Sequence, residues 1–260
     1  MADDTVEMRL ASGEALVTLN RPDVHNAFDD ALIQRLGDML DALAKRHDVR
    51  VLVLAGAGKS FSAGADLAWM RRMAGYTEAE NRADALRLAQ LMHRLDTMPM
   101  PTVARVHGAA IGGGVGLVAC CDIALASTAA SFALSEVRLG LIPAVISPYV
   151  IGAIGPRAAR RYMLTAERFD AAEARRIGLV HQLAEPDQLD GLVKTVVDAL
   201  KLGGPKALAE TKRLALDVGG APSEAVRADT AGRIARLRAS PEGREGVTAF
   251  LEKRKPGWQA

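Results

Sequence analysis

Apolar and polar positions along this chain of 260 residues follow two different periods, which together predict an α/β protein. Short, unbroken apolar runs are typical of strands that are covered on both faces. Such runs, together with one alternating segment near the start, predict strands at residues 14–20, 51–56, 102–106, 122–126, 131–134 and 179–183.

Between these runs, apolar residues recur every three to four positions, as they do on the buried face of a helix. The clearest helix begins with Thr77 and Glu80, which are spaced as a capping box. We expect it to end near Met98 because the prolines that follow cannot continue a helix.

The periodicity changes along the chain and indicates two parts. Strand and helix signals alternate through residues 1–200, and from about Pro205 only helical spacing remains. We therefore expect an α/β core at 1–200 and a C-terminal helical region at 201–260.

Composition excludes several classes of function. The net charge is +2 and both signs alternate along the helical segments, which argues against a nucleic-acid partner. No apolar run approaches the length of a membrane span. The acidic start MADDTVEM is unlike a signal or transit peptide, so we expect a cytoplasmic protein. The five histidines are scattered and the adjacent Cys120 and Cys121 sit in an apolar run, so we expect no metal site and buried, reduced thiols.

The segment HGAAIGGGVGLVACCDIA, residues 107–124, carries four glycines within five positions. One interpretation is a dinucleotide site, because Gly114, Gly116 and Ala119 satisfy G-x-G-x-x-G/A and Glu136 lies 20 residues beyond Gly116. The glycines do not follow their strand directly, which counts against this interpretation.

A second interpretation joins residues 107–124 with SFSAGADL, residues 60–67. Both place small residues at a strand-to-helix junction, where backbone amides lack partners within the helix. Two such amides converging on one point would form an oxyanion hole for a carbonyl oxygen. Spacing alone leaves this interpretation open beside that of two tight turns.

Five segments, taken together, resemble the enoyl-CoA hydratase/isomerase (crotonase) superfamily in order and spacing. They read NRPDVHNAF, FSAGADL, MPTVARVHGAAIGGGVGLVACCDIALAS, FALSEVRLGLIP and ARRIGLVHQL. The resemblance implies a spiral of ββα units with a C-terminal helical trimerisation region. It also implies an acyl-CoA substrate, no cofactor beyond that coenzyme A, and a homotrimer or a hexamer built as a dimer of trimers.

The resemblance also assigns roles to residues. The oxyanion donors fall on the backbone amides of Ala65 and Gly113, and Glu136 falls on a catalytic glutamate. A second glutamate of the hydratases is replaced here by Gly116. Positions expected to contact the substrate are His25, Ala63, Asp66, Gly112 and Gly116.

These residues indicate hydration of a short or branched enoyl-CoA, with Glu136 as the general acid and base. The stretch AVISPYVIGAIG, together with GGGVGLVACCDIA, resembles a bacterial subgroup that acts on branched or carboxylated enoyl-CoAs such as methylglutaconyl-CoA. If Gly116 makes room for such a substituent, Gly116→Ala should slightly stabilise the fold. An enoyl-CoA isomerase that uses Glu136 as a single proton shuttle and a non-catalytic acyl-CoA-binding homologue remain alternatives.

Overall fold

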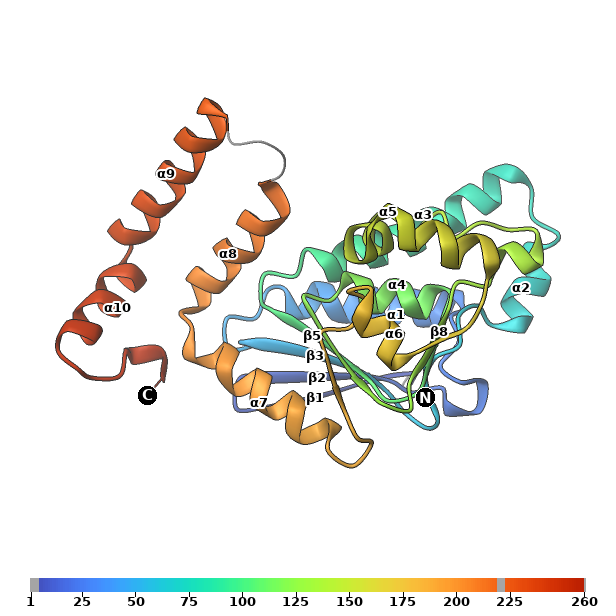
Figure 1. Ribbon diagram of the computed structural model, residues 1–260, viewed down its shortest axis with the longest axis horizontal. Helices are drawn as coiled ribbons and strands as arrows, with labels where there is room; N and C mark the ends of the chain where they lie inside the picture. The colour runs from blue at the N-terminus through green and yellow to red at the C-terminus, as the bar shows by residue number, and fades with distance from the viewer. Residues whose placement is uncertain (1–4, 219–222, 260) are drawn as a thin grey trace.

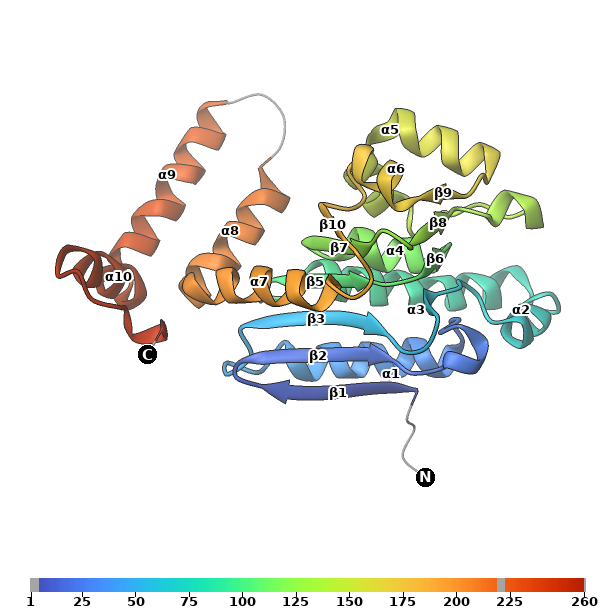
Figure 2. The same ribbon diagram turned by 60° about the horizontal axis from the view of Figure 1, so that its bottom comes forward.

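A six-stranded sheet forms the centre of the protein in a computed structural model that describes residues 5–218 and 223–259. Its strands lie in the order β1-β2-β3-β5-β7-β10; the first pair is antiparallel and the others are parallel (Figure 2). They are β1 (Val6–Ala11), β2 (Glu14–Leu19), β3 (Val51–Gly56), β5 (Thr102–Val106), β7 (Ile123–Ser127) and β10 (Gln182–Ala184).

A smaller sheet holds the strands that follow those of the large sheet along the chain. It consists of β4 (Ser60–Ser62), β6 (Ala109–Ile111), β8 (Ser131–Ala133) and β9 (Phe169–Asp170). The pairs β3/β4, β5/β6 and β7/β8 each give one strand to each sheet and are followed by a helix. This repeat confirms the predicted spiral of ββα units.

Helices cover both faces of the large sheet (Figures 1 and 2). Those of the body are α1 (Asp30–Leu43), α2 (Leu67–Met73), α3 (Glu78–Asp96), α4 (Gly113–Cys120), α5 (Ser147–Thr165), α6 (Ala171–Arg176) and α7 (Leu189–Leu202), with 3-10 turns η1 (Pro22–Val24) and η2 (Glu136–Leu139). Helices α1, α3 and α4 pack on one face and α7 packs on the other.

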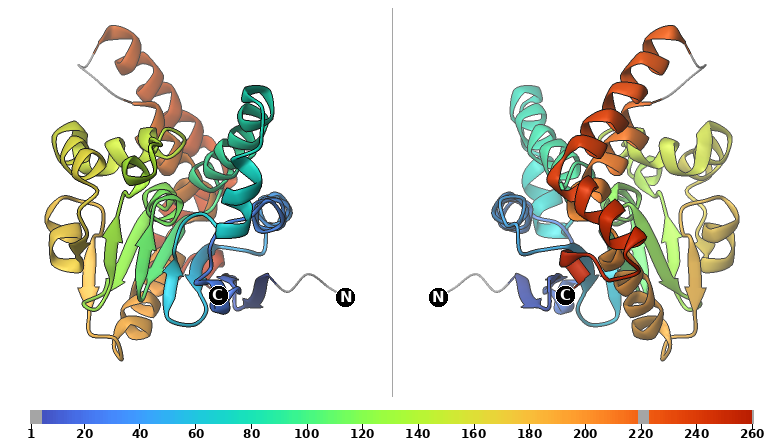
Figure 3. Two further views of the ribbon diagram at one scale, coloured as in Figure 1. Left: turned by 90° about the vertical axis from the view of Figure 1, so that its right-hand side faces the viewer. Right: turned by 90° about the vertical axis from the view of Figure 1, so that its left-hand side faces the viewer.

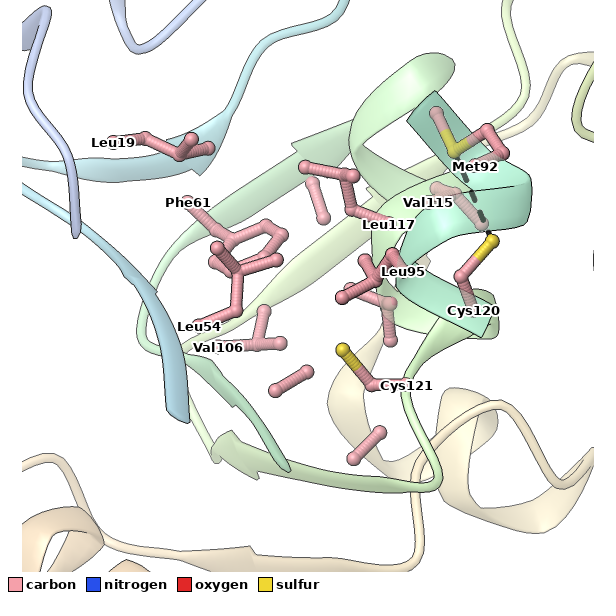
Figure 4. Close-up of a cluster of buried hydrophobic side chains, with 14 of the residues drawn as sticks. Leu19, Leu54, Phe61, Met92, Leu95, Val106, Val115, Leu117, Cys120 and Cys121 are labelled. Atoms are coloured by element: carbon pink, nitrogen blue, oxygen red, sulfur yellow. Dashed lines mark hydrogen bonds between the residues drawn. The ribbon is translucent and has the colours of Figure 1, made fainter. Parts of the chain in front are cut away.

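Strand β3 shows why the sequence forms buried strands. Leu52 and Leu54 point to the side of α1, α3 and α4, whereas Val51 and Val53 contact α7. Successive side chains on a strand face opposite sides, so a strand buried on both sides must be apolar throughout. Figure 4 shows Leu54 in the cluster that also contains Cys121. Both cysteines are buried and free, as predicted.

Three local features differ from the sequence expectations. The sequence analysis did not predict β1, and it predicted no strand within residues 60–67, which contain β4 and the first residue of α2. The strand expected at 179–183 lies at Gln182–Ala184. Strands of three residues are fixed by pairing with neighbours that are distant in the chain, which no local pattern reports.

Helices α8 (Pro205–Asp217), α9 (Glu224–Ala239) and α10 (Pro241–Leu251) project from the body on the side away from α2 (Figures 1 and 3). Together with the final 3-10 turn η3 (Gly257–Gln259), they are called the C-terminal arm below. Neither α8 nor α9 buries a residue, and α10 buries only Ala249. The arm therefore has almost no core of its own.

Candidate active site

The loop between β4 and α2 runs beside residues 25–28 and pairs with their backbone. The amide of Ala63 donates to the carbonyl of His25 (2.9 Å), and that of Asp66 to the carbonyl of Phe28 (2.8 Å). The amide of Phe28 donates to the carbonyl of Gly64 (2.6 Å). Among the described residues, the amide of Ala65 finds no acceptor, so this donor is fixed in place and free.

Asp66 holds this loop against the start of α2. Its carboxylate accepts from the amides of Ala68 (2.7 Å) and Trp69 (3.2 Å), as the N-cap of that helix. Its other oxygen lies 3.0 Å from the guanidinium of Arg21. Burial alone would raise the pKa of Asp66, but these donors outweigh it and the pKa is lowered. Asp66 therefore positions the loop; its oxygens are committed to the protein.

Asn26 was not singled out from the sequence and proves to be central to the same loop. It is fully buried, and its Nδ2 donates to the carbonyls of Ala57 and Ser60 (2.8 Å each). Its Oδ1 accepts from the amide of Arg21 (2.8 Å). The backbone is left-handed here, with φ 56°, a conformation that asparagine tolerates better than most residues. That preference was the one signal the sequence offered.

His25, expected to contact coenzyme A, lies beside Asn26 with the same left-handed backbone. Its Nδ1 is 3.1 Å from Oγ of Ser60. Its carbonyl receives the amide of Ala63, so the backbones of the two expected contact residues are joined directly.

The glycine segment forms the second loop of the site, between β6 and α4. Gly112 has φ +51°, and its amide donates to the carbonyl of Ala133 (2.9 Å). Gly113 is the first residue of α4, and its amide has no acceptor in the part of the chain that the structure describes. The free amide at the positive end of a helix favours an anion or a polarised oxygen.

The missing side chains of these glycines make way for other parts of the protein. A β-carbon on Gly113 would lie 2.6 Å from Cε2 of Phe28, and one on Gly114 would lie 2.6 Å from the carbonyl oxygen of Ser62. Real β-carbons do not approach other atoms so closely, so these glycines let the two loops touch. The backbone of Phe28 also pairs with Ala65, so this one residue contacts both loops that carry the free amides.

Glu136 brings a carboxylate to this junction from the first residue of η2. A β-carbon on Gly112 would lie 3.1 Å from its Oε1. Its Oε2 is buried and has no hydrogen-bond partner within residues 5–218 and 223–259. Burial raises the pKa of Glu136. A carboxyl group with a raised pKa is a better proton acceptor than an ordinary carboxylate and can act as a general acid and base.

Gly116 corrects one expectation from the sequence. No open space lies beside it: a β-carbon here would be 2.9 Å from Cβ of Ile146, closer still to its Cγ2, and 3.3 Å from Cε of Met92. Overpacking costs about 1–3 kcal/mol, more than the ~1 kcal/mol that alanine gains over glycine in a helix. The prediction that Gly116→Ala stabilises the fold is therefore wrong, because Ile146 fills the space.

Among the described residues, no group of three or more His, Cys, Asp or Glu side chains could hold a metal ion. No helix in those ranges combines the length and apolarity that crossing a membrane requires.

Comparison with known proteins shows which family the chain belongs to. The profile of the enoyl-CoA hydratase/isomerase family matches residues 10–260. A crystal structure of an enoyl-CoA hydratase from Shewanella pealeana shares the fold with a TM-score of 0.95 and 47% identity, covering 98% of this chain and 96% of that chain. A crotonyl-CoA hydratase of Syntrophomonas wolfei is 32% identical over 258 residues, 98% of each chain. A short-chain-enoyl-CoA hydratase of Clostridium acetobutylicum is 30% identical over 93% of this chain and 92% of its own.

The match extends through both loops, so the glycine segment belongs to this family's pattern and not to a dinucleotide-binding motif. With the spiral of ββα units also shared over nearly the whole length, the protein belongs to the enoyl-CoA hydratase/isomerase family of enzymes.

Proposed function

We propose that this enzyme adds water across the C2=C3 bond of a short enoyl-CoA thioester. The observation that supports it is the combination of two free, fixed amides, at Ala65 and Gly113, with the half-buried carboxyl of Glu136, whose Oε2 has no hydrogen-bond partner among the described residues. The amides receive the thioester oxygen and stabilise the negative charge that develops on it. The reaction needs no cofactor beyond the coenzyme A of the substrate.

In this mechanism Glu136 acts twice. As a carboxylate it takes a proton from water while the water oxygen bonds to C3, and the C2=C3 electrons move into the thioester to give an enolate. The two amides hold the enolate oxygen. Glu136 then returns the proton to C2, so that one water is added in total and the carboxylate is regenerated.

The side chains around Gly116 limit which acyl groups the proposed site can hold. Ile146 and Met92 fill the space beside Gly116 with apolar atoms. A charged group placed there would lose its hydration without gaining a partner. This favours an apolar acyl group, linear or with a small branch. A methylglutaconyl-like substrate stays within the proposal only if its carboxylate lies away from Gly116.

Double-bond isomerisation is the second candidate. It needs one group that carries a proton between C2 and C4, and Glu136 alone can do this. The family covers both reactions. A second carboxylate, which would favour hydration, is absent at position 116.

Absorbance of the conjugated thioester separates the candidates. Loss of absorbance with crotonyl-CoA supports hydration, and a gain with a 3-enoyl-CoA supports isomerisation. Binding of crotonyl-CoA and of the 3-enoyl-CoA without any change in absorbance would instead mean a non-catalytic acyl-CoA-binding homologue. A panel of linear, methyl-branched and carboxylated enoyl-CoAs then defines the substrate.

We also propose that the C-terminal arm packs against neighbouring copies, in a trimer or a pair of trimers. Its helices expose large apolar side chains, with Phe250 80% and Leu251 73% exposed. Figure 1 shows α9 and α10 standing clear of the sheets. Light scattering tests this proposal, and a monomer at micromolar concentration would contradict it.

A further inference from the structure

Gly112, the N-cap of helix α4, and Gly116 within that helix are about one turn apart, and a different side chain lies against each of them. The amide of Gly116 donates to the carbonyl of Gly112 (3.2 Å), so the two lie about 6 Å apart along the helix axis. Glu136 lies against Gly112 and Ile146 against Gly116. The carboxylate of Glu136 and the branched apolar side chain of Ile146 therefore lie against two positions that are four residues apart at the start of α4.

Ile146 is held firmly in this place. It is the residue directly before α5, and only 3% of it is exposed. Met92 of α3 closes the same space from another direction, and Figure 4 shows it against α4 beside Val115 and Cys120. The volume that a side chain at position 116 would need is filled by apolar atoms from two other helices.

We infer that Ile146 is a specificity-determining residue that forms the wall of the acyl site next to Glu136. The inference rests on the proposed function. When the amide of Gly113 binds the thioester oxygen, C2 and C3 of the acyl group lie within about one turn of α4. C2 is then nearer Glu136, and C3 is nearer Ile146. The wall leaves Glu136 without a second acid–base group and limits branching at C3.

Binding of saturated thioesters tests the wall without requiring turnover. Butyryl-CoA and isovaleryl-CoA differ by one methyl at C3, and their dissociation constants are measured by calorimetry on the wild type, Ile146→Ala and Val150→Ala. Val150 is the matched control, since it is a fully buried apolar residue one turn further along the same helix. Ile146→Ala should shift the affinity ratio toward isovaleryl-CoA by at least about fivefold, within the range that one methyl group decides in apolar pockets.

The control should leave that ratio within about twofold, because its cavity lies away from the acyl group. Equal ratios in Ile146→Ala and Val150→Ala would overturn the inference. If the wild type binds both esters but hydrates no enoyl-CoA, the proposed function fails. The affinity ratio still tests whether Ile146 forms the wall of the acyl site. If it binds neither ester, both proposals fail.

The contact with Gly116 has its own test, by thermal melting. Gly116→Ala should lower the melting temperature, and Gly116→Ala/Ile146→Ala should lower it by less than the two single changes added together, because the cavity accepts the new methyl. Full additivity would show that Ile146 does not fill this space.

Discussion

Helices α1 and α8 are nearly equal in length, but α1 buries seven of its fourteen residues and α8 none of its thirteen. Helix α1 lies on the large sheet within the main core. Helix α8 is the first helix of the C-terminal arm, where Ala249 of α10 is the one buried residue of the three helices. The body thus folds on its own apolar surface, whereas the arm presents its apolar surface outward.

This difference explains where the site lies. An oxyanion hole needs amides held at fixed positions, and packing provides this only where neighbours surround the backbone. Phe28, buried in the body, touches both loops that carry the free amides. The arm has no such surroundings, and we expect its order to depend on assembly.

Polar contacts join the two regions. Nζ of Lys212 in α8 lies 2.8 Å from Oδ2 of Asp122, and the Lys212 side chain is only 8% exposed. The same oxygen accepts from the amide (2.8 Å) and hydroxyl (2.9 Å) of Thr102. Arg50 donates to the carbonyls of Gly203 (2.5 Å), just before the arm, and of Trp258 (3.2 Å), in the last turn of the arm. The orientation of the arm thus depends on a few partly buried charged side chains.

The largest expected effect is in the body. Glu136→Gln keeps the shape of the side chain but cannot take a proton, so kcat should fall by at least about 10². Binding of butyryl-CoA should change little, because the amides and the packing remain. Turnover of enoyl-CoA with steady-state kinetics checks this, and activity within a few-fold of the wild type would remove Glu136 from the mechanism.

Two phenylalanines, one in the body and one in the C-terminal arm, test the difference between these two regions. Phe132 is fully buried and stacks on Phe169 with ring centroids 5.6 Å apart, so Phe132→Ala should destabilise the fold by about 3–5 kcal/mol at any protein concentration. Phe250 lies in the arm, where Phe250→Ser should cost the isolated chain less than about 0.5 kcal/mol.

Assembly gives the second variant a further signature. Because association stabilises the folded chain by mass action, the effect of Phe250→Ser should grow with protein concentration. Melting curves recorded over a wide concentration range check this. A concentration-independent effect in both variants would break the distinction between body and arm.

The joint between the regions gives an intermediate effect. Lys212→Met leaves Asp122 without its cation in a partly buried place, and should cost about 1–3 kcal/mol in urea unfolding. Arg213→Met is the matched control, since its ion pair with Glu210 is exposed and should be worth less than about 0.5 kcal/mol. Equal losses would mean that the buried pair does not anchor the arm.

The smallest effect concerns the stability of the site itself. Since burial raises the pKa of Glu136 in the folded state, folding binds extra protons between the usual carboxyl pKa and the raised one. Stability is therefore lost as pH rises through this window. Glu136→Gln removes the charge, so it should melt slightly higher than the wild type at neutral pH, and the gain should vanish in acid. A constant difference at all pH values would contradict this.

The sequence could predict those elements whose signals are local. The run at Val51–Gly56 and the capping box of Thr77 and Glu80 appear in the structure where the pattern predicts them. The ββα spiral and the family followed from five motifs in order, and both are confirmed. The roles assigned to Ala65, Gly113 and Glu136 remain predictions, for which the structure supplies free amides and a buried carboxyl.

Tertiary structure alone decided what surrounds those residues. Asn26 binds backbone groups of residues 57 and 60, and Ile146 reaches a glycine 30 positions earlier in the chain. A periodic pattern records which face of an element is apolar, because that depends on neighbours three or four positions away. It does not record which distant side chain fills a given space. The sequence therefore determined that position 116 lacks a carboxylate, and only the folded chain decided that Ile146 takes its place.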